Sequence, residues 1–356
     1  MALDLDPGTA GLGNPRLIKA IAEEIDRGAI PFDKFMSLAL YHPEHGYYRK
    51  AGRIGPQGDF VTSSSVHPLF GWTIAGWCHW VWEQLGSPAE FTIVEPGAGD
   101  GRLAAAILDW AAGRDDRFAE SLQYVAIEPN APGVEERVTW VGALVPPVEY
   151  GAVISNEFFD ALPVKLYEAS EQGPVEIGVR WDGKQFVEAN LAVGSIDGAP
   201  ASGRFEVNPG LWATMQSLAG LVGRGAVLTF DYGYPREELW ASWRHQGTLL
   251  AFYKHTAHEN PYIHVGEQDL TAHVDFTTLE AALDGSGFKT FGPAAQSEFL
   301  YAVGLPALVD AARSDLQEYF GRRRVLETLT DGAGLGRVRV LAGTRGFEGV
   351  PPGFQS

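Results

Sequence analysis

Cysteine is almost missing from this sequence, because Cys78 is the only one among 356 residues. An intrachain disulfide framework and a zinc site built from several cysteines are therefore excluded. The N-terminal region carries Asp4 and Asp6 and lacks the basic and apolar pattern of a signal peptide and the Arg-rich pattern of a transit peptide. We therefore expect a reducing compartment, the cytoplasm, as the location of the protein.

Long apolar runs and an excess of basic residues are lacking as well. The most apolar stretch, residues 70–82, is interrupted by His79 and is shorter than the roughly 18 residues that a membrane-spanning helix needs. The sequence has 27 Lys and Arg residues and 45 Asp and Glu residues, which gives a formal charge of −18. This field repels phosphates and favours a cationic substrate, although solubility alone also accounts for it. We expect a soluble protein with no membrane partner and no nucleic-acid partner.

The remaining composition is typical of a globular chain, with 45% apolar residues and many turn-forming residues, 43 Gly and 22 Pro. Residues 1–90 are predicted to form a helical region that covers part of the active site. From Phe91 onward, strand, loop, helix and strand follow one another, which predicts a mostly parallel, Rossmann-like α/β sheet over residues 91–356. Within it, residues 165–207 alternate in short β-like runs, and we expect an inserted antiparallel substrate segment there.

A glycine-rich loop follows the first expected strand and opens the next helix. It reads Glu95-Pro96-Gly97-Ala98-Gly99-Asp100-Gly101, and glycine lets a backbone turn tightly close to a ligand. A dinucleotide-binding loop reads G-x-G-x-x-G, so the glycine spacing argues against a nicotinamide oxidoreductase. The acid Glu95 suits a cationic amino-acid head group better than a pyrophosphate. We predict that this loop binds S-adenosylmethionine (SAM), which carries an ammonium and a sulfonium; an ordinary tight turn is the alternative.

Acidic and amide side chains end two further expected strands. Glu128 follows a strand at residues 124–127, where an acid can accept the hydroxyl protons of a ribose; a solvated acid is the alternative. Asn156, Glu157 and Asp160 follow a strand at residues 152–154, and carboxylates bind a guanidinium through paired hydrogen bonds. A helix cap at Asn156 is the alternative for this motif.

The histidines do not indicate a metal centre. Their spacing matches no standard helical ligand pair, and the ligands that usually complete a zinc site are not evident. The residues concerned are His255, His258, His264 and His273. We predict no metal.

Several ordered blocks of sequence carry a family resemblance. One of them reads Ser155-Asn156-Glu157-Phe158-Phe159-Asp160-Ala161-Leu162-Pro163-Val164. The other blocks are residues 35–43, 46–48, 58–63, 95–103, 230–233, 247–249 and 266–276 and the region near Gln296. Together they resemble the MidA-type family, the relatives of the mitochondrial complex I assembly arginine methyltransferase.

The resemblance implies a class I methyltransferase fold, SAM as methyl donor and methylation of a protein arginine, with symmetric dimethylation in the best understood relatives. It places the glycines of the loop at the cofactor, and we add Asp59 and Thr62 to that set. It also places Asn156, Glu157 and Asp160 at the methyl-transfer mouth. There, the two carboxylates are predicted to orient a guanidinium and to take its proton.

One departure from the family leaves the methyl acceptor open. Many relatives read Thr-Ser/Ala-Pro-Glu where this chain has Thr62-Ser63-Ser64-Ser65, so the Pro and the Glu are lost. This departure supports a small-molecule methyltransferase as an alternative to a protein methyltransferase. A SAM-binding assembly factor with little catalysis is a further alternative. The sequence also leaves a homodimer open.

Overall fold

A computed structural model describes residues 11–25, 28–49, 62–114, 117–130 and 135–355 of the chain. The chain forms two compact units, and each is built from discontinuous segments. The first unit comprises residues 1–60, 159–211 and 234–275, and the second comprises residues 61–158, 212–233 and 276–356. The boundary expected at residue 90 falls inside the second unit, because the apolar helix that precedes it packs with the helix after the glycine loop.

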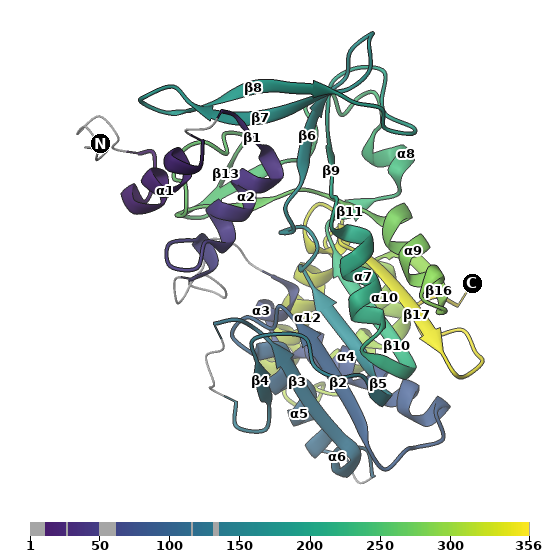
Figure 1. Ribbon diagram of the computed structural model, residues 1–356. Helices are drawn as coiled ribbons and strands as arrows, with labels where there is room; N and C mark the ends of the chain where they lie inside the picture. Colours follow the sequence, from purple (N-terminus) through teal and green to yellow (C-terminus); the bar gives the residue numbers. More distant parts are fainter. Residues whose placement is uncertain (1–10, 26–27, 50–61, 115–116, 131–134, 356) are drawn as a thin grey trace. The chain divides into compact units, whose positions relative to one another are not determined.

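The second unit is built on a seven-stranded sheet with the order β16-β17-β10-β5-β2-β3-β4 (Figure 1). Its strands are β2 (Phe91–Pro96), β3 (Leu122–Ile127), β4 (Thr139–Val141), β5 (Val148–Asn156), β10 (Val222–Asp231), β16 (Lys289–Ala295) and β17 (Arg339–Arg345). Neighbours from β4 to β10 are parallel, and β17 is antiparallel to both β10 and β16. This arrangement confirms the predicted mostly parallel sheet.

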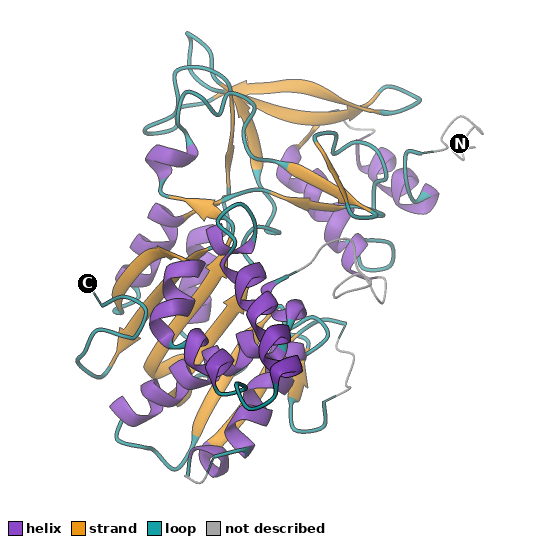
Figure 2. Ribbon diagram, turned by 180° about the vertical axis from the view of Figure 1, so that it is seen from behind, coloured by secondary structure: helices purple, strands orange, loops and turns teal. Residues whose placement is uncertain are grey.

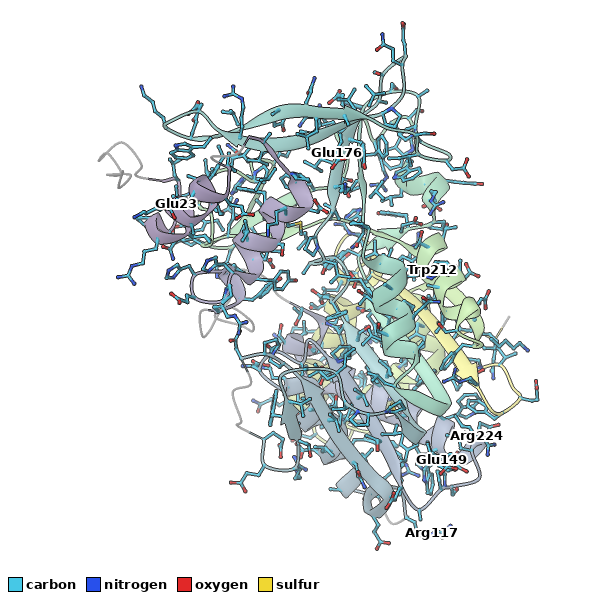
Figure 3. All side chains as sticks on the ribbon, in the orientation of Figure 1. Glu23, Arg117, Glu149, Glu176, Trp212 and Arg224 are labelled. Atoms are coloured by element: carbon cyan, nitrogen blue, oxygen red, sulfur yellow. The ribbon has the colours of Figure 1, made fainter. Side chains whose placement is uncertain are left out.

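Helices cover both faces of this sheet (Figures 1 and 2). They are α3 (Ser63–Val66), α4 (Pro68–Gln84), α5 (Arg102–Ala112), α6 (Phe118–Ser121), α7 (Leu211–Ala219), α9 (Phe276–Gly285), α10 (Gln296–Val303), α11 (Leu305–Asp310) and α12 (Leu316–Thr330), with a 3-10 helix at Leu335–Arg337. Every residue of β2 is buried, as expected for a central parallel strand covered on both faces. Helix α4 packs against α5, β5 and β10, whereas α9 packs against β16 and β17. Figure 3 labels Trp212, a residue of α7 that is 43% exposed.

The first unit is dominated by antiparallel strands. A five-stranded sheet has the order β1-β7-β6-β9 with β8 beside β7, and smaller sheets join β13-β12-β14 and β11-β15. The strands are β1 (Ile30–Pro31), β6 (Lys165–Glu168), β7 (Val175–Trp181), β8 (Phe186–Val193), β9 (Arg204–Val207), β11 (Gly233–Tyr234), β12 (Leu250–Tyr253), β13 (Thr256–His258), β14 (Asp269–Thr271) and β15 (Val274–Asp275). The helices are α1 (Pro15–Ile25), α2 (Phe32–Tyr41) and α8 (Arg236–Leu239), with a 3-10 helix at Tyr47–Arg49. The predicted inserted β segment is therefore antiparallel.

Packing explains why the N-terminal helices share a unit with the inserted strands. The ring of Phe35 on α2 lies 5.2 Å, centroid to centroid, from that of Phe186 on β8, and both are buried. An ion pair of 2.9 Å between Lys165 and Glu176, which Figure 3 labels on β7, joins β6 to β7. None of the helices in the described ranges is long and apolar enough to cross a membrane.

Candidate active site

The glycine loop and the Asn156-Glu157 motif lie at the carboxyl ends of two adjacent parallel strands, β2 and β5. From β2 the sheet continues to β3 and β4 on one side and to β5 and β10 on the other. This reversal of strand order makes the carboxyl ends of β2 and β5 a topological switch point, where open α/β sheets bind their ligands. The tertiary fold thus brings together two motifs that are about 60 residues apart in the sequence.

The loop after β2 adopts a backbone that requires glycine. Gly97, Gly99 and Gly101 have φ angles of +68°, +56° and +80°, in the left-handed region. A Cβ on Gly97 would lie 2.8 Å from the ring of Phe158, and one on Gly101 would lie 2.8 Å from the ring of Trp140. The loop is therefore a close-fitting backbone cradle that leads into α5, and it has the form expected for holding a cofactor.

Glu95 supplies a buried carboxyl group at the base of this cradle. It is 4% exposed, and the hydroxyl of Tyr124 donates a hydrogen bond of 2.7 Å to its Oε2. The pKa of Glu95 is raised to about 8, mainly by burial; the hydrogen bond from Tyr124 lowers it, and the nearby charges of Asp100 and Glu128 contribute to the rise. A cation beside Glu95 would favour its charged form, so the residues present fit the ammonium group of SAM.

The raised pKa of Glu95 predicts a pH-dependent stability. The native state holds the proton up to about pH 8, whereas the unfolded chain releases it near the ordinary value of 4.5. Between these values the native state binds more protons, so stability falls as pH rises, by up to about 1.4 kcal/mol per pH unit. Glu95→Gln should remove the fall in stability with rising pH that is due to the proton of Glu95. In urea denaturation the variant should gain stability relative to wild type between pH 5 and pH 9; an unchanged difference would refute the raised pKa.

Glu128 ties the end of β3 to the glycine loop. Its Oε2 accepts a hydrogen bond from the backbone N–H of Gly99 at 3.3 Å, and its Oε1 accepts one from the N–H of Asn130 at 3.2 Å. Glu128 is thus directed toward the cradle and is more than a solvated strand-end acid. Its role at a ribose stays a prediction.

Glu157 has a conformation that the sequence did not predict. Its φ angle is +51°, which for a side chain with a Cβ costs about 1–2 kcal/mol. Its N–H donates to the carbonyl of Phe230 at 2.8 Å, and its Oε1 accepts hydrogen bonds from the N–H of Ser63 at 3.0 Å and from Nδ2 of Asn156 at 3.2 Å. Backbone strain of this kind persists where the surroundings enforce it, and it occurs often at functional sites.

The helix-cap alternative for this motif is wrong. Residues 157–162 form bends and turns, with no helix after Asn156. The left-handed residue Glu157 turns the chain away, and the buried carboxylate of Asp231 accepts a hydrogen bond of 3.1 Å from the N–H of Phe158. Oδ1 of Asn156 is buried and has no hydrogen-bond partner within the described part of the chain.

The other predicted site residues lie in different surroundings. Asp160 belongs to the first unit, where burial raises its pKa to about 7 and Ala272 donates its N–H to the Asp160 carbonyl at 2.9 Å. Asp59 lies outside the described residues. Thr62 precedes α3 and is buried in the second unit. The structure thus brings Asn156, Glu157, Thr62 and the cradle into one unit.

Ser65 accounts for the departure from the family pattern at Thr62. Its hydroxyl accepts a hydrogen bond from the N–H of Thr62 at 3.1 Å and donates one to the carbonyl of Thr62 at 2.8 Å. In a capping box a Glu or Gln at this third helical position reaches back to the same N–H. Ser65 therefore makes the local contact that a glutamate would make here.

This cap predicts a stability effect. Ser65→Ala should lower the free energy of unfolding by about 1 kcal/mol, the usual value for a lost cap, and Ser65→Glu should retain the wild-type stability. Urea denaturation measures both. Ser217→Ala is the matched control, because that exposed hydroxyl donates to the carbonyl of Ala213 in its own helix. Equal stability of the two alanine variants would show that Ser65 does not cap α3.

The sequence analysis missed four residues of this site: Ser63, Tyr124, Asp231 and Gln296. Asp231 had a sequence signal, because it ends a strand as Glu95 and Asn156 do. Ser63 and Gln296 lie in blocks that carry the family resemblance, but no local pattern indicates their contacts or those of Tyr124, because these contacts depend on the folded chain. Within the described residues, no group of three or more His, Cys, Asp or Glu side chains could hold a metal ion.

The strand order, the reversed strand β17 and the glycine cradle at the switch point define a class I methyltransferase fold. The model of a family described as S-adenosyl-L-methionine-dependent methyltransferase matches residues 73–294. The chain belongs to this family, and SAM is its methyl donor.

Known proteins support this assignment over nearly the whole chain. A Burkholderia thailandensis protein crystallised with S-adenosyl-homocysteine is 30% identical, with a TM-score of 0.86, and the match covers 95% of this chain and 94% of that protein. The protein arginine methyltransferase NDUFAF7 homolog, mitochondrial, of Drosophila melanogaster is 29% identical over 93% of this chain and 85% of its own length. The human protein arginine methyltransferase NDUFAF7, mitochondrial, is 26% identical over 84% of this chain and 76% of its own length.

The expectation of a cytoplasmic location is wrong as an inference from this sequence, because the curated relatives are mitochondrial proteins. The error has a physical reason. A single cysteine indicates that the fold does not depend on disulfides, and this property does not single out the cytoplasm among compartments.

Proposed function

We propose that this methyltransferase transfers the methyl group of SAM to an arginine guanidinium of a protein. The observation that carries the proposal is the pair Asn156 and Glu157 at the end of β5, next to the glycine cradle at the switch point. A carboxylate is the acceptor that the N–H groups of a guanidinium need, and Nδ2 of Asn156 donates to Oε1 of Glu157 and so helps to orient this carboxylate. The names of the curated relatives support the same acceptor.

The cofactor site in this proposal comprises Glu95, Gly97, Gly99, Gly101, Glu128, Thr62 and Asp59. When bound, SAM supplies an electrophilic methyl group on a sulfonium. The glycine backbone and Glu95 hold and orient the cofactor, and alignment of the two reactants is the main contribution that such a displacement needs from a protein.

Two carboxylates of the chain are proposed to handle the acceptor proton. An arginine side chain is protonated in water, so it must lose a proton as it is methylated. Glu157 would orient the guanidinium and accept this proton. Asp160 follows three residues later, and its pKa of about 7 lies in the range that suits a general base near neutral pH.

Mass spectrometry of the host proteome with and without the gene tests the acceptor. The proposal expects at least one arginine dimethylation that disappears with the gene and returns with the wild-type gene, but not with Glu157→Gln. Purified enzyme with labelled SAM should then methylate a peptide that contains this arginine, and should not methylate the same peptide with lysine in its place.

The same experiments distinguish the alternatives. Label transferred only to metabolites would identify a small-molecule methyltransferase. SAM binding without transfer to any peptide or metabolite would indicate a SAM-binding assembly factor. A homodimer is a separate question, which light scattering of the purified chain answers.

A further inference from the structure

The carboxylate of Glu157 is held by a residue that is distant in the sequence. The N–H of Ser63 donates to Oε1 of Glu157 at 3.0 Å, and both residues belong to the second unit. Ser63 is the first residue of α3. A backbone N–H in the first turn of a helix has no partner within the helix, so this donor can point at a carboxylate without loss of a helical hydrogen bond.

Ser63 itself is fixed by a buried glutamine. The hydroxyl of Ser63 donates to Oε1 of Gln296 at 3.0 Å, and both side chains are fully buried. Neither can therefore touch a methyl acceptor from solvent. The position of Ser63 depends on where Gln296 is held.

Gln296 is held at two points. Its Nε2 donates to the carbonyl of Leu329 near the end of α12 at 3.0 Å, and its backbone N–H donates to the carbonyl of Val338 at 2.7 Å. Because the amide nitrogen must face the Leu329 carbonyl, the amide oxygen faces Ser63. The serine hydroxyl must therefore be the donor, so Ser63 donates to Gln296 and Gln296 donates to Leu329.

We propose that Ser63 and Gln296 are positioning residues that fix the carboxylate of Glu157, with Gln296 as the anchor. The inference rests on the proposed catalytic role of Glu157. The capping contacts of Ser65 also help to fix Ser63, because they hold Thr62, the residue directly before it. The strained backbone of Glu157 and this anchor together restrict the carboxylate to one place.

A double-mutant cycle on kcat tests the catalytic consequence. Ser63→Ala removes the link to Gln296 and should lower kcat about tenfold, with the KM for SAM changed less than about twofold, because a displaced carboxylate affects transfer rather than cofactor binding. In a Glu157→Gln background the same substitution should have no further effect. An equal loss of kcat in both backgrounds, or no loss in either, would overturn the proposal.

Ser121→Ala is the matched control for folding. Its hydroxyl is also buried and also donates a hydrogen bond, of 2.9 Å, to the carbonyl of Phe118. We expect this variant to lower Tm without a change in kcat. If it lowers kcat as much as Ser63→Ala does, the effect of Ser63 is only structural and the proposal fails.

A second readout does not depend on the methyl acceptor. The amide proton of Ser63, observed by nuclear magnetic resonance, should move upfield in Glu157→Gln, because the acceptor of its hydrogen bond loses its charge. It should also move upfield in Gln296→Leu, because Ser63 is then displaced and its N–H lies farther from the Glu157 carboxylate. If Gln296→Leu leaves this resonance unchanged, Gln296 is not the anchor. If the resonance moves as expected but the wild-type enzyme methylates no arginine, the anchor stands and the proposed acceptor is wrong.

Discussion

Glu157→Gln should lower kcat at least about 100-fold, the usual range for loss of a general base. The amide keeps the size of the side chain but cannot take the proton that the guanidinium must lose. The left-handed backbone of Glu157 should be unaffected, because both side chains carry a Cβ. Binding of SAM, measured by calorimetry, should remain within about twofold of wild type, and transfer of labelled methyl groups to the acceptor peptide measures kcat.

Glu149→Gln is the matched control for this prediction. Glu149 lies on the same strand, β5, near its other end, and is exposed (Figure 3). The same change of charge should leave kcat unchanged there. Full activity of Glu157→Gln at all pH values would remove Glu157 from the chemistry and leave Asp160 as the candidate base.

Gly97→Ala should weaken SAM binding at least about tenfold, which corresponds to about 1.4 kcal/mol. The new Cβ would lie 2.8 Å from the ring of Phe158, so the loop or the ring must move, and the cradle changes shape. Its φ angle of +68° adds strain. Calorimetric titration with SAM measures the affinity, and thermal unfolding without SAM measures the strain separately.

Gly86→Ala separates the effect of the positive φ angle from the effect of the clash with Phe158. Gly86 has a similar φ angle of +83°, but nothing lies within 4 Å of a Cβ built there. Both variants should therefore lose stability from the left-handed backbone, Gly97→Ala more because of its clash with Phe158, and only Gly97→Ala should lose SAM affinity. If the two variants bind SAM equally well, the close fit at Gly97 has no part in holding the cofactor.

The glycine loop shows how far the sequence could predict the site. Three glycines at alternate positions between an apolar strand and an Ala-rich helix predicted a cofactor cradle, and all three have positive φ angles. The backbone of the loop could be predicted because strand, turn and helix depend on residues that are neighbours in the chain, whereas its contact with the cofactor stays a prediction. The position of Glu128 next to the loop could be predicted in the same way, because Glu128 directly follows its strand.

The surroundings of Glu157 could not be predicted in this way. The donor from Ser63 comes from 94 residues away, and the anchor Gln296 lies 233 residues from Ser63. The left-handed turn at Glu157 also replaced the helix cap that Asn156 and the following acids suggested. A capping pattern is local, whereas the hydrogen bond from Phe158 to Asp231 that fixes this turn joins the residues after β5 to the end of β10.

The sequence by itself therefore determined the class of fold, the glycine loop and the succession of strands and helices along the chain, because these follow from short-range periodicity and turn chemistry. Only the tertiary structure decided which residues share a unit, as the packing of Phe35 on Phe186 demonstrates. It also decided that the ends of β2 and β5 meet and that Glu157 is fixed from α3. These contacts join distant segments, and burial and hydrogen bonding in the folded chain select them.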